Sequence, residues 1–267
     1  VDKDFKNKNT YFFIENLHLH CKYFNFSLNQ KVKLNNIFKK YNITHIFHLA
    51  AQPEVMQAYD SPYETFENNV RATYSLLDVC NKYSNKIKSI VVASSDKAYG
   101  EYSISKLPYK ESYPLKAIHP YDVSKVCTDY ISLSYAKSLK KLPIIVTRFC
   151  NIYGPGQKNL SCIVPNSIFH CMGKMNLTLR SDGKFIRDYI YIDDVIKLYV
   201  EISRALSLNH KLSGEVFNYG TNNPTTVKEI LEIIFAYFEK TNDLKKIIKS
   251  AKNNKIKGEI KHQYMDF

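Results

Sequence analysis

The sequence predicts an α/β protein whose main part is a doubly wound parallel sheet, followed by a smaller C-terminal α/β part. Two observations lead to this prediction. Short runs of consecutive apolar residues alternate with longer amphipathic segments, a pattern typical of parallel strands joined by helices. One apolar run, residues 90–93, is followed directly by polar and charged residues, which therefore lie where a parallel strand ends.

The first half of the chain contains three helical segments, each followed by a short buried run. Apolar residues recur at helical spacing in all three segments. We expect helices at 30–41, 64–83 and 121–139, and strands at 44–50, 88–93 and 144–148. Their alternation favours right-handed βαβ units within one parallel sheet.

Beyond residue 150 the elements become shorter and turns separate them. Residues 151–156 form a turn-rich loop. Thr226 and Glu229 have the spacing of a capping box at the start of a helix. We also expect a helix at 163–172, a strand at 177–180, and a strand from 187 that passes into a helix capped by Asp193 or Asp194 and ending near 205.

The first glycine of the chain is Gly100. A dinucleotide-binding domain normally opens with a glycine-rich turn, which lets a helix N-terminus approach the pyrophosphate. Residues 1–99 cannot form such a turn. We therefore expect that the sequence begins after the first βα unit of the domain; the alternative is that the domain binds no dinucleotide.

The formal net charge of +13 raises nucleic acid and membrane surfaces as possible partners. The lysines are scattered, and only the tail from Lys245 to Lys257 is a dense run, as on a solvated helix face. No apolar run approaches the ~20 residues that a membrane span needs. We expect no signal peptide, and neither nucleic acid nor a membrane as partner.

Six cysteines occur without a CxxC pair, and several lie in apolar patterns. We therefore expect buried, reduced thiols and a cytoplasmic protein. His18, His20 and Cys21 form a metal-like cluster, but no second ligand pair follows at a useful spacing, so we expect no metal site.

The residues that carry chemistry gather in two stretches, one at a strand end and one at a helix start. Tyr121 and Lys125 are four residues apart, so a helix places both on one face. An adjacent ammonium favours the ionised form of a phenol, which makes Tyr121 a candidate base. Asp96 and Lys97 add an acid-capable and a base-capable group at the strand end. Four titratable groups in one cleft indicate an enzyme.

Six motifs in this order resemble those of the extended short-chain dehydrogenase/reductase superfamily, in its sugar-nucleotide epimerase/dehydratase branch. Each motif alone is weak, but six in the same order at plausible spacing are specific. They cover most of residues 40–230. The motifs are His48-Leu49-Ala50-Ala51-Gln52, Asn69-Val70, the strand end 94–100, Tyr121 with Lys125, Arg148 with 151–156, and 187–195.

The resemblance implies a Rossmann-type fold, NAD as the cofactor and a nucleotide sugar as the substrate. It also implies a homodimer through helices 64–83 and 121–139. The implied domains are a dinucleotide-binding domain at 1–150, truncated at its start, with 184–205 packing back onto it, and a substrate-binding domain at 151–183 and 206–267.

Within the branch, the strand end is most similar to CDP-glucose 4,6-dehydratases, in which an Asp-Lys pair follows a serine. The mechanism that the resemblance implies uses Tyr121 to take the proton of the sugar 4-hydroxyl. Lys125 keeps the phenolate charged and holds a ribose hydroxyl, and Ser95 hydrogen-bonds the 4-oxygen. Lys97 takes the C5 proton, and Asp96 protonates the departing 6-hydroxyl.

The resemblance also implies binding residues. Ala50 and Ala51 are small enough for the backbone to approach the dinucleotide. The planar guanidinium group of Arg187 binds the substrate pyrophosphate. Asn151 lies toward the substrate phosphates. The implied cofactor contacts are Leu49, Ala50, Ala51, Gln52, Asn69, Ser94, Tyr121 and Lys125.

The leading hypothesis is therefore an NAD-dependent sugar-nucleotide 4,6-dehydratase, a lyase, with a CDP-glucose-like substrate. Alternatives are a sugar-nucleotide 4-epimerase or a related, decarboxylating enzyme of the same superfamily, or an inactive truncated nucleotide-binding fragment. For single residues, Asp96 could cap the following segment, Lys97 could be a solvated charge and Arg187 a surface ion pair.

Overall fold

The computed structural model describes residues 11–138, 142–157, 159–179 and 181–253. The chain divides into two compact units, each with its own sheet pairings and apolar core. The first unit comprises Val1–Gly100, Glu111–Phe149 and Ile196–Asn218, and the second comprises Glu101–Lys110, Cys150–Val195 and Tyr219–Phe267.

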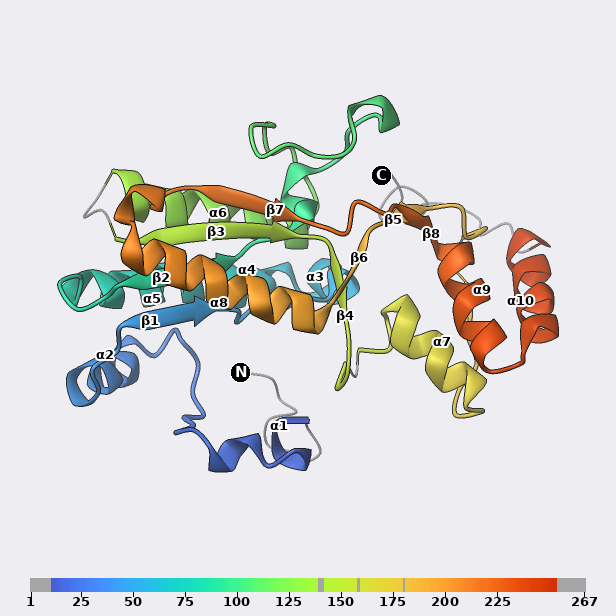
Figure 1. The fold of residues 1–267 in the computed structure, drawn as a ribbon, viewed down its shortest axis with the longest axis horizontal. Helices are drawn as coiled ribbons and strands as arrows, with labels where there is room; N and C mark the ends of the chain where they lie inside the picture. The colour runs from blue at the N-terminus through green and yellow to red at the C-terminus, as the bar shows by residue number, and fades with distance from the viewer. Residues whose placement is uncertain (1–10, 139–141, 158, 180, 254–267) are drawn as a thin grey trace. The chain divides into compact units, whose positions relative to one another are not determined.

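The first unit is built on a four-stranded sheet in the order β1-β2-β3-β7 (Figure 1). Phe47 of β1 pairs with Val91 of β2, which pairs with Ile145 of β3, and both ladders run parallel. The expected parallel sheet is confirmed. Its strands are β1 (His45–His48), β2 (Ser89–Ala93), β3 (Ile144–Phe149) and β7 (Val216–Tyr219).

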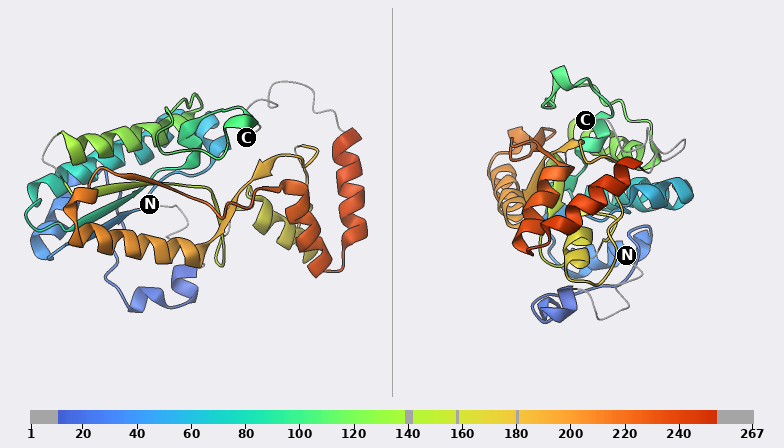
Figure 2. Two further views of the ribbon diagram at one scale, coloured as in Figure 1. Left: turned by 45° about the horizontal axis from the view of Figure 1, so that its top comes forward. Right: turned by 90° about the vertical axis from the view of Figure 1, so that its right-hand side faces the viewer.

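Helices cover both faces of this sheet, as a parallel sheet requires. α5 (Ala72–Lys82) and α6 (Pro120–Lys137) lie on one face, and the part of α8 (Ile192–Leu208) that belongs to this unit lies on the other. The two views of Figure 2 show this layering from further directions. The doubly wound arrangement expected from the sequence is confirmed.

The other helical segments of the first unit are short. They are α1 (Tyr11–Ile14), η2 (Leu17–Leu19), α2 (Lys31–Lys40), α3 (Val55–Asp60), α4 (Pro62–Phe66), the π-helical turn η3 (Glu67–Arg71) and the 3-10 turns η4 (Asp96–Tyr99) and η6 (His210–Leu212).

The core of the first unit lies between the sheet and helices α2, α5 and α6. Ile90 and Val92 of β2 and Leu77 of α5 are fully buried there. Because alternate residues of a strand point to opposite faces, Val91 points toward the face that α8 covers. On that face, Tyr199 of α8 stacks on Phe149 with 5.2 Å between the ring centroids.

The second unit has two small sheets and a separate apolar cluster. In it, α7 (Ile163–Cys171) and α10 (Thr241–Asn253) pack against α9 (Val227–Tyr237), and Leu231 and Phe235 of α9 are fully buried. The capping box expected at Thr226 and Glu229 is present at the start of α9. Its elements are β4 (Asn151–Tyr153) parallel to β6 (Tyr189–Tyr191), β5 (Ile186–Arg187) antiparallel to β8 (Thr225–Thr226), η5 (Ile104–Lys106), α7 (Ile163–Cys171), α9 (Val227–Tyr237) and α10 (Thr241–Asn253).

Four local expectations are wrong. Residues 151–153, expected in a turn-rich loop, form β4, and of the cysteines expected to be buried only Cys80 and Cys171 are buried. The described residues of the segment 177–180 form no strand; Leu177 N instead donates to His170 Nδ1 at 3.0 Å, and Leu179 packs into the cluster around α9. Asp193 and Asp194 lie within the first turn of α8, which already begins at Ile192, so neither caps it. Arg180, Leu139 and the lysine-rich tail beyond residue 253 lie outside the described residues.

The compact units differ from the domain boundaries expected at 151–183 and 206–267. Residues 206–218 belong to the first unit because β7 pairs with β3 there. Residues 184–195 belong to the second unit because β5 and β6 pair with strands of that unit. The long insertion between η4 and α6 contributes Glu101–Lys110 to the second unit.

Within the ranges given above, no helix has the length and apolar character needed to cross a membrane. In the same ranges, no three His, Cys, Asp or Glu side chains are grouped to hold a metal ion.

The buried core predicts a large effect of truncation at Leu77, which is 0% exposed, and a small one at Leu208, which is 79% exposed. We expect Leu77→Ala to lower the free energy of unfolding by about 2–5 kcal/mol, because it leaves a cavity under the sheet. Leu208→Ala, the same chemical change, should cost less than about 0.5 kcal/mol in urea unfolding. Equal losses in the two variants would contradict this core.

Candidate active site

Ser95 fixes the turn by which the chain leaves β2 and enters η4. Its Oγ accepts a hydrogen bond from Lys97 N at 3.2 Å and donates one to Asp96 Oδ1 at 3.0 Å. Ser95 is therefore the cap of η4, and the structure does not give Asp96 that role. The serine also orients the Asp96 carboxyl group at the end of the strand.

Gly100 ends η4 in a conformation that other residues rarely adopt, with a φ of 68°. A Cβ at this position would lie 2.7 Å from the backbone carbonyl of Lys116. Lys116 N donates to Tyr99 O at 3.0 Å, which brings the returning chain close to η4. The glycine thus permits the tight packing that holds the end of η4 in place.

Lys125 joins helix α6 to the end of β2. Its side chain is 5% exposed, and its Nζ donates to Ala93 O at 3.0 Å. Ser94 Oγ donates to Lys125 O at 3.3 Å, which adds a second link between the two elements. Lys125 Nζ lies 5.9 Å from the centroid of the Tyr121 ring, as expected for an i, i+4 pair. Burial lowers the pKa of Lys125 to about 8.

The Tyr121 hydroxyl faces the strand-end residues. A hydrogen bond with Ser95 and the charge of Asp96 both act on its ionisation, so Tyr121, Ser95 and Asp96 lie together as expected. The direction of the effect is opposite to the one expected from Lys125. Burial raises the pKa of Tyr121 and the Asp96 carboxylate raises it further, against the hydrogen bond with Ser95, which lowers it. The Lys125 ammonium, whose Nζ donates to Ala93 O, is not among the causes of this shift.

Asn69 joins the loop after β1 to α6. Its Oδ1 accepts from Gln52 N at 2.6 Å, and its Nδ2 donates to Gln52 O at 3.1 Å and to Ser124 Oγ at 2.8 Å. Asn69 is 1% exposed and makes these bonds within the protein, which indicates a structural role. The cofactor contact expected for it remains a prediction. Gln52 is likewise buried, so both residues act by shaping the loop.

The loop between β1 and Gln52 lies at the carboxyl end of the parallel sheet. Leu49 is 54% exposed, Ala50 is exposed and Ala51 is half-buried. Open α/β sheets bind their ligands at this edge. Small or apolar exposed residues there leave backbone accessible to a flat ring, and the cofactor contacts expected for these three residues remain predictions.

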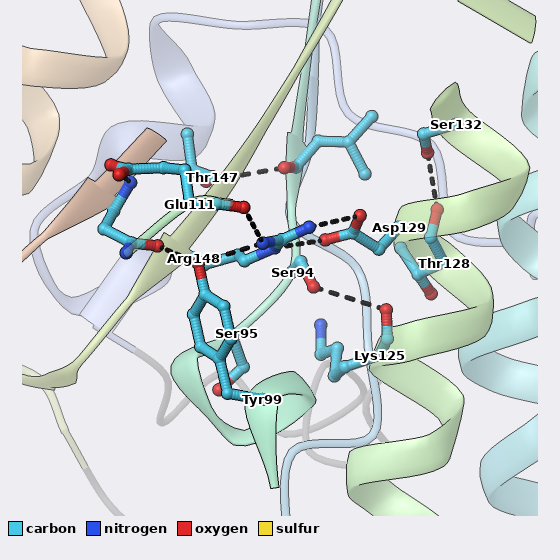
Figure 3. Close-up of polar contacts among 12 residues, drawn as sticks. Ser94, Ser95, Tyr99, Glu111, Lys125, Thr128, Asp129, Ser132, Thr147 and Arg148 are labelled. Carbon is cyan, nitrogen blue, oxygen red and sulfur yellow. Dashed lines mark hydrogen bonds and ion pairs between the residues drawn. The ribbon is translucent and has the colours of Figure 1, made fainter. Parts of the chain in front are cut away.

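Arg148 of β3 is the centre of a buried polar network that sequence reasoning missed (Figure 3). Its Nε and Nη2 donate to the two carboxylate oxygens of Asp129 at 2.7 and 2.9 Å, and its Nη1 donates to Tyr99 Oη at 2.9 Å. Tyr99 donates in turn to Asn218 Oδ1 at 2.7 Å. Asn218 N donates to Glu111 Oε1 at 2.9 Å.

The network links the two elements that carry the candidate catalytic residues. Tyr99 ends η4, which begins at Asp96, and Asp129 lies one turn beyond Lys125 on α6. A guanidinium that bonds both elements fixes their distance from each other. Arg148 belongs to one of the six sequence motifs, but no sequence pattern indicated its pairing with Asp129 and Tyr99.

The two residues expected at the substrate phosphates lie in the second unit. Asn151 Nδ2 donates to Asp188 O at 3.2 Å, and Arg187 Nη1 donates to Ile186 O at 2.7 Å. Asp188 also accepts from Asn222 N at 3.0 Å and from Thr221. The substrate contacts of Asn151 and Arg187 remain predictions.

The profile of the NAD dependent epimerase/dehydratase family matches residues 5–220. The chain belongs to this family. It is 32% identical over 229 residues to the dTDP-D-glucose 4,6-dehydratase of Dictyostelium discoideum, covering 80% of this chain and 50% of the relative. This family member spans 28–61% of the length of the first curated relatives that it matches.

Solved structures of epimerases and dehydratases also align with this chain. This epimerase/dehydratase family member aligns with the dTDP-glucose 4,6-dehydratase of Bacillus anthracis in complex with NAD at a TM-score of 0.74 and 28% identity, over 86% of this chain and 68% of that one. The UDP-glucose 4-epimerase of Thermotoga maritima with UDP-glucose gives a TM-score of 0.72 and 26% identity, over 85% and 71%. Both the fold and the superfamily expected from the motifs are confirmed.

The buried ion pair predicts a strong effect of removing one partner. Asp129 is 0% and Arg148 5% exposed, so Asp129→Asn leaves a buried guanidinium without a counter-charge. We expect it to lower the free energy of unfolding by about 3–5 kcal/mol. The exposed pair Arg204–Glu201 is the control, and Glu201→Gln should cost less than about 1 kcal/mol. Similar small losses in both variants would show that the buried pair does not hold the site.

His48 predicts a pH-dependent stability. It is 4% exposed, its Nε2 lies 2.8 Å from Thr73 Oγ1, and burial followed by the charge of Lys125 lowers its pKa to about 4. Between pH 6.5 and 4 the unfolded chain therefore binds more protons at His48 than the folded one, so stability falls as the pH falls.

The measurement is the difference in unfolding free energy between the wild type and His48→Gln, from pH 7.5 to 4. We expect wild type to lose stability relative to the variant by roughly 3 kcal/mol across the range from pH 6.5 to 4. Ile46→Val, on the same strand, removes no titratable group and should give a difference that does not change with pH. A constant difference for His48→Gln would contradict the burial of a neutral imidazole.

Proposed function

We propose that this family member acts as an NAD-dependent sugar-nucleotide 4,6-dehydratase, a lyase. The observation that carries the proposal is the cluster in which Ser95 bonds Asp96 and meets the Tyr121 hydroxyl, with Lys97 on the same turn. Loss of water from a 4-keto sugar needs a base for the C5 proton and an acid for the 6-hydroxyl. Asp96 and Lys97 supply both beside the tyrosine, whereas epimerisation at C4 needs neither.

The described residues fit the nicotinamide end of NAD. Buried Lys125 lies beside Tyr121 at the carboxyl edge of the sheet, where Leu49 and Ala50 are exposed. When bound there, NAD would supply the hydride acceptor for C4 and return that hydride to C6. Lys125 would hold the ribose, and Leu49 to Ala51 would flank the dinucleotide.

The protein residues move the protons. Tyr121 takes the proton of the 4-hydroxyl, and Ser95 holds the 4-oxygen while the ketone forms. The ketone acidifies the C5–H bond, and Lys97 takes that proton as its amine becomes an ammonium. Asp96 gives its proton to the 6-oxygen, which leaves as water, and the Lys97 ammonium returns a proton to C5 when C6 is reduced. The raised pKa of Tyr121 means that its phenolate is a strong base once formed.

The substrate class is a nucleoside diphosphate hexose. The Asp96–Lys97 pair favours a CDP-glucose-like substrate. Two relatives are named as dTDP-D-glucose and UDP-glucose 4,6-dehydratases, which supports the reaction class but not the choice of nucleotide base. We assign Arg187 and Asn151 to the diphosphate. We also propose a homodimer through the helices at 64–83 and 121–139, and a cytoplasmic location, for which the free state of all six cysteines is the support.

The test is product analysis with NAD and CDP-, UDP- or dTDP-glucose. A 4-keto-6-deoxy sugar absorbs characteristically in alkali, and we expect this product from at least one of the three. A C4 epimer would favour the epimerase alternative, and no turnover with any of the three would favour an inactive fragment.

Tyr121 and Asp96 give separable predictions for the same assay. We expect Tyr121→Phe to lower kcat by about 10²–10⁴-fold, because the 4-hydroxyl loses its proton acceptor. Asp96→Asn should slow water loss and leave oxidation at C4 detectable. Tyr130→Phe, at a 56% exposed position on the same helix, is the matched control and should keep wild-type kcat. Unchanged turnover in Tyr121→Phe would exclude this mechanism.

A further inference from the structure

Ser124 is a fully buried hydroxyl group of α6 that the proposed mechanism leaves unused. It lies three residues after Tyr121 and directly before Lys125, and it is 0% exposed. Its Oγ donates to Tyr121 O at 2.6 Å and accepts from Asn69 Nδ2 at 2.8 Å. Ser124 therefore links the turn that carries Tyr121 to η3, a separate element of the chain.

The direction of each of these bonds follows from the groups that make it. Gln52 N can only donate, so the Asn69 atom that faces it at 2.6 Å is Oδ1, and Nδ2 faces Ser124. An amide nitrogen can only donate, so Ser124 Oγ accepts from it. A hydroxyl group has one proton, and in Ser124 this proton is therefore committed to the Tyr121 carbonyl group.

Asn69 is itself held by the loop that follows β1. Its Nδ2 also donates to Gln52 O at 3.1 Å, so its side chain bonds both backbone groups of Gln52. Asn69 lies in the π-helical turn η3, which packs against α6, and such turns are frequent at functional sites. The side chain of Asn69 therefore fixes Ser124 relative to the loop 49–52, where cofactor contacts are expected.

The first turn of α6 has no cap from its own N-terminal residue. A helix commonly fixes its first turn through the side chain of its N-cap. The N-cap of α6 is His119, which makes no side-chain capping bond and whose Nδ1 bonds the Tyr59 hydroxyl group. The bond from Ser124 to Tyr121 O is thus a side-chain bond to the turn that carries the candidate base.

The usual behaviour of a helix serine does not account for Ser124. Serine and threonine inside helices commonly donate to a carbonyl group of the preceding turn. Ser132, two turns further along α6, does so, with Oγ donating to Thr128 O at 2.7 Å (Figure 3). Ser124 in addition accepts a bond from Asn69, which lies 55 positions earlier in the sequence. The bond to Tyr121 O is therefore tied to a second element.

We propose that Ser124 is a positioning residue of the active site, whose hydroxyl group, held by Asn69, fixes the first turn of α6 so that Tyr121 meets the sugar 4-hydroxyl group. Its catalytic meaning rests on the proposed function. Ser124 acts through the backbone of Tyr121 and transfers no proton itself. Because a base must lie within hydrogen-bond reach of the proton that it takes, a small shift of this turn slows the reaction.

The first test measures amide hydrogen exchange by NMR in the whole chain without substrate. Val123 N donates to His119 O at 2.8 Å, so its exchange reports the opening of the first turn of α6. We expect Ser124→Ala to speed exchange of this amide by about 10-fold or more, because one net hydrogen bond is worth about that factor in the opening equilibrium. Unchanged exchange in Ser124→Ala overturns the proposal.

Ser132→Ala is the matched control for this measurement. Ser132 is also 0% exposed on α6, and its variant loses a bond of the same kind, to a backbone carbonyl group. It should change the exchange of the Val123 amide less than about 2-fold. Equal acceleration by Ser132→Ala would show a general loosening of the helix and would overturn the proposal.

The kinetic test separates positioning from a purely structural role. With the nucleotide sugar that the wild type turns over, Ser124→Ala should lower kcat by about 10-fold or more, with KM changed less than about 2-fold. Ser132→Ala should keep wild-type kcat and lose a comparable amount of stability in urea. Equal kcat in the two alanine variants overturns the positioning role.

Two further cases are covered. If Ser124→Ala does not fold, Ser124→Cys carries both tests, because a thiol group fills the site and is only a weak donor and acceptor. Faster exchange and a lower kcat are again expected, and wild-type values of both overturn the proposal. If the wild type turns over no nucleotide sugar, the proposed function fails, and the exchange measurement still decides whether Ser124 holds the first turn of α6.

Discussion

The ion pair between Arg148 and Asp129 is the interaction on which the geometry of the candidate site depends. Its two members come from β3 and α6 and are almost fully buried, so neither has water as an alternative partner. The third bond of the guanidinium, to Tyr99, reaches the end of η4. One side chain therefore sets the distance between the helix that carries Tyr121 and the turn that carries Asp96.

The same burial sets the charge states in the site. Burial raises the pKa of Tyr121 and lowers that of Lys125, so the protein alone favours a neutral phenol and weakens the ammonium. Asp122 shows the same tendency, with its pKa raised to about 6. In a site that disfavours charged side chains, the charge of a bound substrate or of a neighbouring residue strongly shifts the pKa values of the buried groups. Such shifts suit groups that must take up and release protons.

Much of the fold could be predicted from the sequence because it depends on local patterns. Apolar runs and helical periodicity located β1 to β3, α2 and α6, and the capping box marked the start of α9. The segment at 177–180 was misread because the alternation of Leu177 and Leu179 resembles a strand, whereas both leucines fill a core cluster without a strand partner. Alternating apolar residues indicate which side chains are buried, but they do not indicate whether the backbone pairs with a neighbouring strand.

The residues of the candidate site could be predicted from the sequence, but their ion pairs and pKa shifts could not. The motifs placed Ser95, Asp96 and Tyr121 together, as the structure does. The Arg148–Asp129 pair joins residues 19 positions apart through tertiary packing, for which the sequence has no spacing rule. The direction of the Tyr121 pKa depends on burial, which a motif does not show.

The central claim is that the residues around Tyr121 catalyse three steps on one sugar. These steps are oxidation at C4, loss of water, and return of the C4 hydrogen to C6. The most direct measurement uses a nucleotide sugar with deuterium at C4 and follows the label by NMR and mass spectrometry. The account predicts a 4-keto-6-deoxy product with the deuterium on its C6 methyl group. Deuterium found at C4 of an epimerised sugar would contradict it.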